Sequence, residues 1–214
     1  KAVGHVNNTL APLLTGREVN EQKKLDDLMI EADGTPEKKQ LGANAILGVS
    51  MAVARAAALE NKTPLYKYLR ELSGLSFKKY ILPRPMMVAI EGGVHADNST
   101  DFQEYLFSVV GGKSISEAVR IGLECYLALK KLLKTKGLST NVGNEGAFAP
   151  GGLKTNEEPL TFMLAAIKAA GYKPGAEVAI SLDPATSEIF EKGRYFLSRE
   201  KKKLTSGEMI KYFA

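Results

Sequence analysis

Side chains that can do acid–base or metal chemistry are concentrated in three polar segments and at the end of one apolar run. The candidate site residues are His95, Gln103, Glu104, Glu145 and Asp183. Two carboxylates that lie close together can raise the pKa of one of them enough to make a general acid, while a third binds a hard cation. Spacing alone indicates only an α/β domain with a carboxylate site, since an Asp before a Pro is also an ordinary turn former.

The run over residues 176–183 is the clearest expected strand. Residues 178, 180 and 182 are large, apolar and share one face, whereas the alternate residues, ending with Asp183, are small or polar. A barrel strand alternates in this way when its outer face packs on helices. Asp183 is then expected at the carboxyl end of the strand, where barrel enzymes place their chemistry.

Helical spacing dominates the first third of the chain, and strands are expected only beyond it. We place a boundary near residue 82, which predicts two domains, 1–82 and 83–214. Two strands and two long helices are expected between that boundary and the strand over residues 176–183. The order strand, strand, helix, helix, strand is unusual for the opening of an alternating barrel.

The composition is that of an ordinary globular protein, with 214 residues, 44% hydrophobic, 25% charged and a formal net charge of +5. The single cysteine, Cys125, cannot form an internal disulfide, which fits a reducing compartment and predicts a cytoplasmic location. One cysteine and two histidines are too few for a zinc cage. Any metal is therefore expected to be bound by carboxylates.

Neither a membrane span nor nucleic-acid binding is expected. The most apolar stretch, residues 43–54, is interrupted by Asn44 and Ser50 and falls short of the roughly 20 residues that a span needs. The cationic runs are short, scattered and without the interleaved aromatic residues of a base-stacking surface. These runs are residues 38–39, 78–79, 130–131 and 201–203.

Eight literal segments of the chain match one family. They are DGT at 33–35, LGANAILGVS at 41–50, PLY at 64–66, PMM at 85–87, GGVHADN at 92–98, DFQE at 101–104, NVGNEGAFAP at 141–150 and LDPATSE at 182–188. Together these segments resemble enolase, the phosphopyruvate hydratase of glycolysis. The segments follow the family's order and spacing and extend over essentially the whole chain.

The resemblance implies the helical part of an N-terminal capping domain, followed by the first part of a modified (β/α)8 barrel that opens strand, strand, helix, helix. It also implies a Mg²⁺-dependent interconversion of 2-phosphoglycerate, a small phosphorylated substrate, and phosphoenolpyruvate. Glu145 matches the proton donor to the departing hydroxyl, and Glu104 its partner carboxylate. Gln103 and His95 match substrate-contacting positions, with His95 on a loop that closes. Asp183 matches the first of three magnesium-binding carboxylates.

The resemblance covers only about the middle half of an enolase. The other two metal carboxylates and a lysine base are expected outside these residues, so the isolated chain is expected to be inactive. The complete protein is expected to form a homo-dimer or a ring of dimers. The chain also departs from the family, with Glu91 in place of the usual Asn, Asn144 in place of Asp and Ala147 in place of Gly.

Two alternatives stay open. The first is a non-catalytic enolase-like scaffold that engages an acidic partner or a cell-surface ligand, which the basic charge balance would suit. The second is another acid-sugar dehydratase of the same superfamily, against which the long literal matches argue. A scaffold predicts salt-sensitive binding, whereas an enolase predicts a magnesium-dependent absorbance change with 2-phosphoglycerate.

Overall fold

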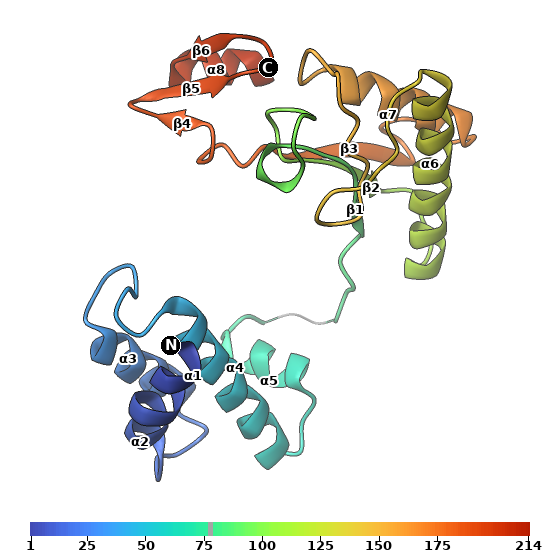
Figure 1. Ribbon diagram of the computed structural model, residues 1–214. Coiled ribbons are helices and arrows are strands. Elements are labelled where there is room, and N and C mark those ends of the chain that lie inside the picture. Colours follow the sequence, from blue (N-terminus) through green and yellow to red (C-terminus); the bar gives the residue numbers. More distant parts are fainter. Residues whose placement is uncertain (77–78) are drawn as a thin grey trace. The chain divides into compact units, whose positions relative to one another are not determined.

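The computed structural model describes residues 1–76 and 79–214 and divides them into two compact units, Lys1–Tyr80 and Ile81–Ala214 (Figure 1). Lys78, which belongs to one of the expected cationic runs, lies outside the described residues. Each unit has its own hydrophobic core.

The first unit is helical. Its elements are α1 (Ala2–His5), a π-helical turn η1 (Val6–Leu10), α2 (Ala11–Leu14), α3 (Gln22–Asp33), α4 (Ala43–Glu60) and α5 (Leu65–Leu72). The helix α3 ends where Gly34 adopts a φ of 70°, a left-handed conformation that glycine adopts without steric cost. The buried Asp33 carboxylate then accepts a hydrogen bond from the Leu41 amide at 2.7 Å, which ties the following loop to the end of α3.

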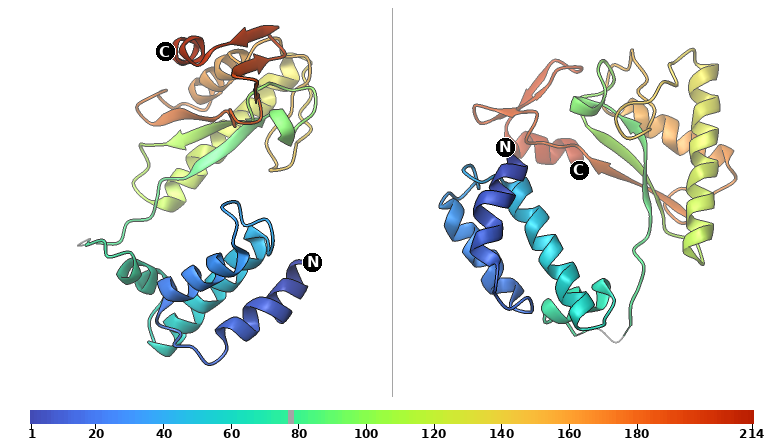
Figure 2. Two further views of the ribbon diagram at one scale, coloured as in Figure 1. Left: turned by 90° about the vertical axis from the view of Figure 1, so that its left-hand side faces the viewer. Right: turned by 60° about the horizontal axis from the view of Figure 1, so that its bottom comes forward.

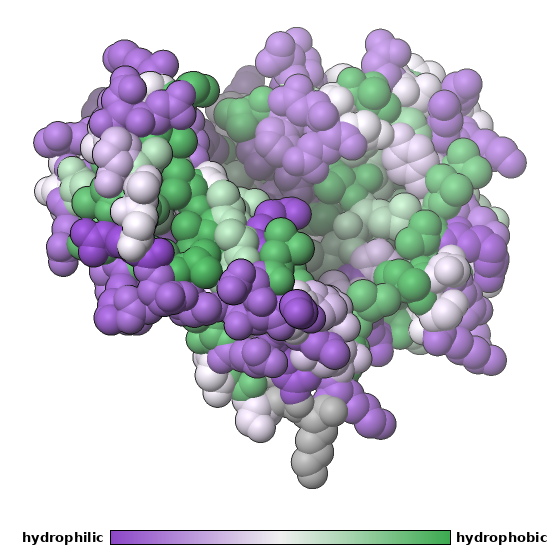
Figure 3. All heavy atoms as spheres, turned by 90° about the horizontal axis from the view of Figure 1, so that it is seen from below, coloured by the Kyte–Doolittle hydropathy of each residue, from purple (hydrophilic) through white to green (hydrophobic). Residues whose placement is uncertain are grey.

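The helix α4 is long and apolar enough to cross a membrane when judged by length and composition only, a test that core helices of soluble proteins also pass. It contacts α1, η1, α3 and α5 within its own unit. Three of its large hydrophobic side chains remain exposed, namely Leu47, Met51 and Leu59. Hydrophobic residues also lie among hydrophilic ones on the face of the molecule drawn in Figure 3.

The second unit is built on a three-stranded antiparallel sheet in the order β1-β2-β3. Its elements up to the last strand of this sheet are β1 (Met86–Glu91), a 3₁₀ turn η2 (Gly93–His95), β2 (Glu104–Val109), α6 (Ile115–Thr135), α7 (Glu158–Ala169) and β3 (Val178–Asp183). The helices α6 and α7 lie against one face of the sheet (Figures 1 and 2). The predicted opening of strand, strand, helix, helix, strand is therefore confirmed.

The predicted alternation along β3 is also confirmed. Val178, Ile180 and Leu182 pack into the core that α6 and α7 cover, opposite Val109, Phe107 and Tyr105 of β2. The other face carries smaller and more polar side chains, and there the Ser108 and Ser181 hydroxyls hydrogen-bond to each other at 2.6 Å. The sheet thus has an apolar face that the helices cover and a second, mixed face that ends in carboxylates.

A β-bulge interrupts β1. Val88 pairs with Leu106 and Ile90 pairs with Tyr105, so that Ala89 between them has no partner on β2. The extra residue resets the alternation of side chains along the strand. As a result, Glu91 comes to lie opposite Glu104.

A second antiparallel sheet and a terminal helix complete this unit. They are β4 (Phe190–Glu191), β5 (Arg194–Leu197), β6 (Lys202–Leu204) and α8 (Ser206–Phe213). A buried side chain, Asn156, connects this part to the segment before β2. Its Oδ1 accepts from the amides of Asp101 at 2.9 Å and Phe102 at 3.3 Å, and its Nδ2 donates to Asp101 and Glu200, both at 3.2 Å.

Candidate active site

Three carboxylates lie side by side at one edge of the three-stranded sheet. Glu91 pairs with Glu104, and Glu104 pairs with Asp183. Residues directly opposite each other on neighbouring strands face the same side of a sheet. Because β2 runs antiparallel to its neighbours, its first residue lies at the same edge as the last residues of β1 and β3.

The loop that carries Glu145 is attached to this edge through Phe148, which lies three residues after Glu145. The Phe148 amide donates to the Ala89 carbonyl at 3.0 Å, and its own carbonyl accepts from the Glu91 amide at 3.0 Å. Tyr126 of α6 stacks on the Phe148 ring at 4.3 Å between centroids, and its hydroxyl donates to the Gly146 carbonyl at 2.7 Å. These contacts bring Glu145 beside the row of carboxylates.

His95 lies where these carboxylates converge. Its Nδ1 is 3.5 Å from Oε1 of Glu104, 3.7 Å from Oε1 of Glu145 and 4.0 Å from Oε2 of Glu91. Among the described residues, this Nδ1 is a buried atom without a hydrogen-bond partner. The structure thus brings together three of the five predicted residues, His95, Glu104 and Glu145, with Asp183 next to Glu104 across the sheet.

Burial and nearby like charges perturb the pKa of the Glu104 carboxyl group. Burial and then the charges of Glu145 and Asp183 raise the pKa of the Glu104 carboxyl group, against a smaller lowering effect of His95 and of a hydrogen bond from Gln103. A carboxylate that is hard to ionise beside two others favours either a retained proton or a bound cation. The edge therefore has the electrostatics of an acid–base or metal site.

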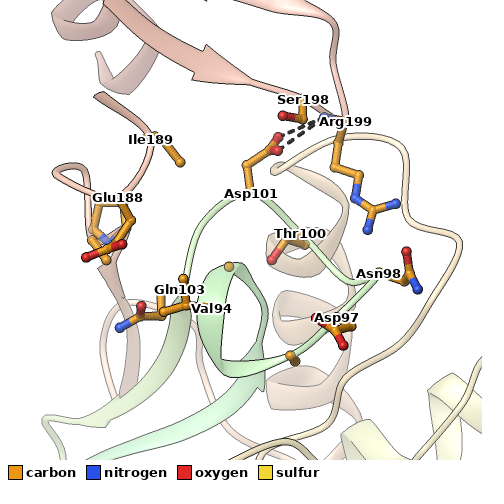
Figure 4. Close-up of a pocket in the computed structure, with 14 residues that line it drawn as sticks. Val94, Asp97, Asn98, Thr100, Asp101, Gln103, Glu188, Ile189, Ser198 and Arg199 are labelled. Atoms are coloured by element: carbon orange, nitrogen blue, oxygen red, sulfur yellow. Dashed lines mark hydrogen bonds between the residues drawn. The ribbon is translucent and has the colours of Figure 1, made fainter. Parts of the chain in front are cut away.

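Gln103 joins this edge to a neighbouring pocket of about 460 Å³, drawn in Figure 4. The pocket is lined by Gln103, the η2 turn, the segment after Asp183 and residues near Arg199. On one side of the pocket, Arg199 is joined to Asp101, because the Arg199 backbone amide donates to both carboxylate oxygens of Asp101 at 3.2 Å (Figure 4). Gln103 is thus placed to contact a molecule in this pocket, directly before Glu104 in the chain.

Ligand atoms of His95, Glu104 and Glu145 lie within 4.8 Å of one another and could hold a metal ion. Asp183, the predicted metal ligand, is not a member of this group. Its side chain is exposed, and its Oδ1 accepts from the Ala185 amide at 3.1 Å. Carboxylate oxygens are the ligands that hard divalent cations prefer, so the row of acidic groups fits a cation of that class.

The comparisons with known proteins agree with this geometry. Residues 1–69 match the family described as "Enolase, N-terminal domain", and residues 79–214 match "Enolase, C-terminal TIM barrel domain". The chain belongs to the enolase family. It is 50% identical over 218 aligned residues to the enolase of Malacoplasma penetrans (strain HF-2), an alignment that covers 99% of this chain and 48% of that protein. The chain thus spans about half the length of this curated relative, and its three-stranded sheet is part of an enolase-family barrel.

Two residues at this enolase-family site were not among the predicted site residues. Glu91 begins one of the polar segments and departs from the family pattern, but the sequence assigns it no role; in the structure its carboxylate is fully buried beneath the Glu145 loop. Tyr126 was noticed only as part of the apolar stripe of a helix, yet its hydroxyl bonds the same loop. An acidic residue between an apolar run and the Gly92-Gly93 pair is the available sequence signal for Glu91, whereas no local signal marks Tyr126.

Proposed function

We propose that the complete protein interconverts 2-phosphoglycerate and phosphoenolpyruvate with loss of water, in a reaction that depends on Mg²⁺. The observation that carries this proposal is that Glu104 and Glu145 each lie within 4 Å of His95 Nδ1, with Asp183 across the sheet from Glu104. Membership of the enolase family supports the same reaction class, that of a hydro-lyase.

Each side chain has a defined task in this proposal. Hydroxide is a poor leaving group, so Glu145 donates a proton to the departing hydroxyl. Glu104 lies beside it, and its raised pKa reflects a site in which an additional negative charge is unfavourable. Asp183 would hold the divalent cation, which supplies electrostatic stabilisation of the negative charge that develops on the substrate. Gln103 and His95 orient the substrate, and closure of the His95 loop excludes water.

The test is turnover of 2-phosphoglycerate by the complete protein, followed by the ultraviolet absorbance of the product with Mg²⁺ and after its removal by a chelator. We expect activity only with the metal and a loss of at least about 100-fold in Glu145→Gln, because general acid catalysis typically contributes about 10²–10⁴-fold. Glu157→Gln, a change of the same type at an exposed position before α7, is the matched control and is expected to keep full activity.

A folded complete protein with no turnover would overturn the proposal. Salt-sensitive binding of an acidic partner by that inactive protein would favour the scaffold alternative instead. The cytoplasmic location, the homo-dimeric or ring-like assembly and the inactivity of the isolated chain remain predictions.

A further inference from the structure

The carboxylate of Glu91 is completely buried, although a carboxylate in a protein interior is unfavourable unless other groups satisfy it. In the described parts of the chain, the only cationic or imidazole nitrogen recorded within 4.0 Å of it is Nδ1 of His95. Its hydrogen-bond donors are instead backbone amides of the Glu145 loop. The Ala147 amide donates to Oε1 at 3.0 Å, and the Glu145 amide is shared between Oε2 at 3.3 Å and Oε1 at 3.4 Å.

The loop is shaped to admit this carboxylate. A Cβ atom at Gly143 would lie 2.6 Å from Cδ and 2.8 Å from Oε1 of Glu91, and 2.7 Å from the carbonyl oxygen of His95. These distances are shorter than van der Waals contact allows, so only glycine fits at this position. The neighbouring Asn144 amide donates to that same His95 carbonyl at 3.3 Å. The loop therefore wraps closely around Glu91 and the backbone of the His95 turn.

We propose that Glu91 is a positioning residue that sets the place of the Glu145 carboxylate relative to His95 and Glu104. The inference rests on the proposed function, in which Glu145 is the proton donor. Glu91 ends β1 directly opposite Glu104, so it is fixed by the same ladder that fixes Glu104. From that fixed point its two oxygens bind the backbone of Glu145 and of Ala147, on either side of Gly146. Both oxygens act as acceptors, which a side-chain amide of the same size cannot reproduce.

Glu91→Gln in the complete protein tests this inference. One acceptor oxygen becomes an amide donor that faces the Glu145 amide or His95, so the loop loses part of its attachment. Because a small displacement of a catalytic group can cost up to about 100-fold, we expect kcat to fall about 10- to 100-fold. KM is expected to stay within about twofold, since positioning of the acid acts on the transition state rather than on substrate binding. Glu157→Gln is again the matched control.

A second variant reaches the same contact from the other side. Gly143→Ala keeps the Glu91 side chain but places a methyl group against its carboxylate and against the His95 carbonyl, so it is expected to lose at least as much kcat as Glu91→Gln. The double variant Glu91→Gln/Gly143→Ala is expected to lose little more than the worse single variant, because both changes break one interaction. Losses that multiply in the double variant would contradict a shared role.

Amide hydrogen exchange separates this inference from the proposed function. In Glu91→Gln the amides of Glu145 and Ala147 are expected to exchange faster, while amides in the middle of β2 keep their rates. Unchanged exchange at both loop amides would overturn the inference, whether or not the protein turns over 2-phosphoglycerate. Faster exchange in a protein without that activity would keep Glu91 as the residue that positions Glu145 and would reject the proposed reaction.

Discussion

Replacement of Asn156 by alanine is expected to destabilise the complete protein and to loosen the segment that leads to Gln103. The Asn156 side chain is 2% exposed, and its Oδ1 is the acceptor for two backbone amides, those of Asp101 and Phe102. Its Nδ2 also connects the Asp101 carboxylate with that of Glu200. Alanine removes all of these partners at once and puts nothing in their place.

The size of the effect follows from the two amides. A buried donor left without an acceptor costs about 1–3 kcal/mol. The Phe102 amide is buried and the Asp101 amide only partly buried, so we assign about 2 and about 1 kcal/mol to them. The expected loss is therefore about 3 kcal/mol, a substantial share of a typical unfolding free energy of about 5–15 kcal/mol.

Urea denaturation followed by circular dichroism gives the difference in unfolding free energy, provided that the denaturant slope stays the same. Amide hydrogen exchange at residues 101 and 102 locates the effect. Asn8→Ala, at an exposed position in η1, is the matched control and is expected to change stability by less than about 0.5 kcal/mol. A loss below about 1 kcal/mol, with unchanged exchange at both amides, would show that the Asn156 contacts do not hold this segment.

Three further predictions concern single side chains of the second unit. Burial raises the pKa of the Cys125 thiol to about 11, so only about one molecule in a thousand is a thiolate at pH 8. A thiol reagent is therefore expected to label Cys125 in the unfolded protein but not in the native protein. Rapid labelling of the native protein would contradict this prediction. The folded-state pKa of Glu104 is raised, so the contribution of its carboxyl group to stability is lost as pH rises through that pKa. The unfolding free energy of Glu104→Gln minus that of the unmodified protein is therefore expected to grow as pH rises above the ordinary pKa of a glutamate, and a constant difference would refute the shift. Tyr126→Phe removes the hydrogen bond to the Gly146 carbonyl but keeps the stacking on Phe148. We therefore expect the unfolding free energy measured by urea denaturation to fall by about 1 kcal/mol. A fall of more than about 2 kcal/mol would mean that the ring also moves.

Local patterns in the sequence were sufficient for the elements whose burial is one-sided. The alternation over residues 178–183 is visible because one face of β3 packs under α6 and α7. The start of α6 is visible because the Ser114 hydroxyl accepts from the Glu117 amide at 3.1 Å, as an N-cap does. In the second sheet only β5 contains an apolar run, residues 195–197, that indicates a short strand. The strands β4 and β6 went unpredicted because β4 has two residues and β6 is mostly lysine.

The predicted site residues came from the family resemblance and from the types of side chain, whereas their geometry depends on contacts between distant parts of the chain. His95 and Glu145 are 50 positions apart, and nothing local indicates that Nδ1 and Oε1 approach to 3.7 Å. Glu91 and Asn156 were missed for the same reason, since each is defined by the backbone amides of another segment. A single sequence does not reveal which amides those are.

The bulge in β1 has a consequence for the register of the strand. If the pairing of Val88 with Leu106 continued regularly through Ala89, Ile90 would lie opposite Glu104, and Glu91 would point to the side that the helices cover. Loss of the bulge with every residue kept would therefore remove a carboxylate from this end of the sheet without changing any acidic residue. Deletion of Ala89 would also remove the bulge but would leave Glu91 opposite Glu104. The place of the Glu91 carboxylate thus depends on one residue standing outside the ladder as strictly as on the identity of its own side chain.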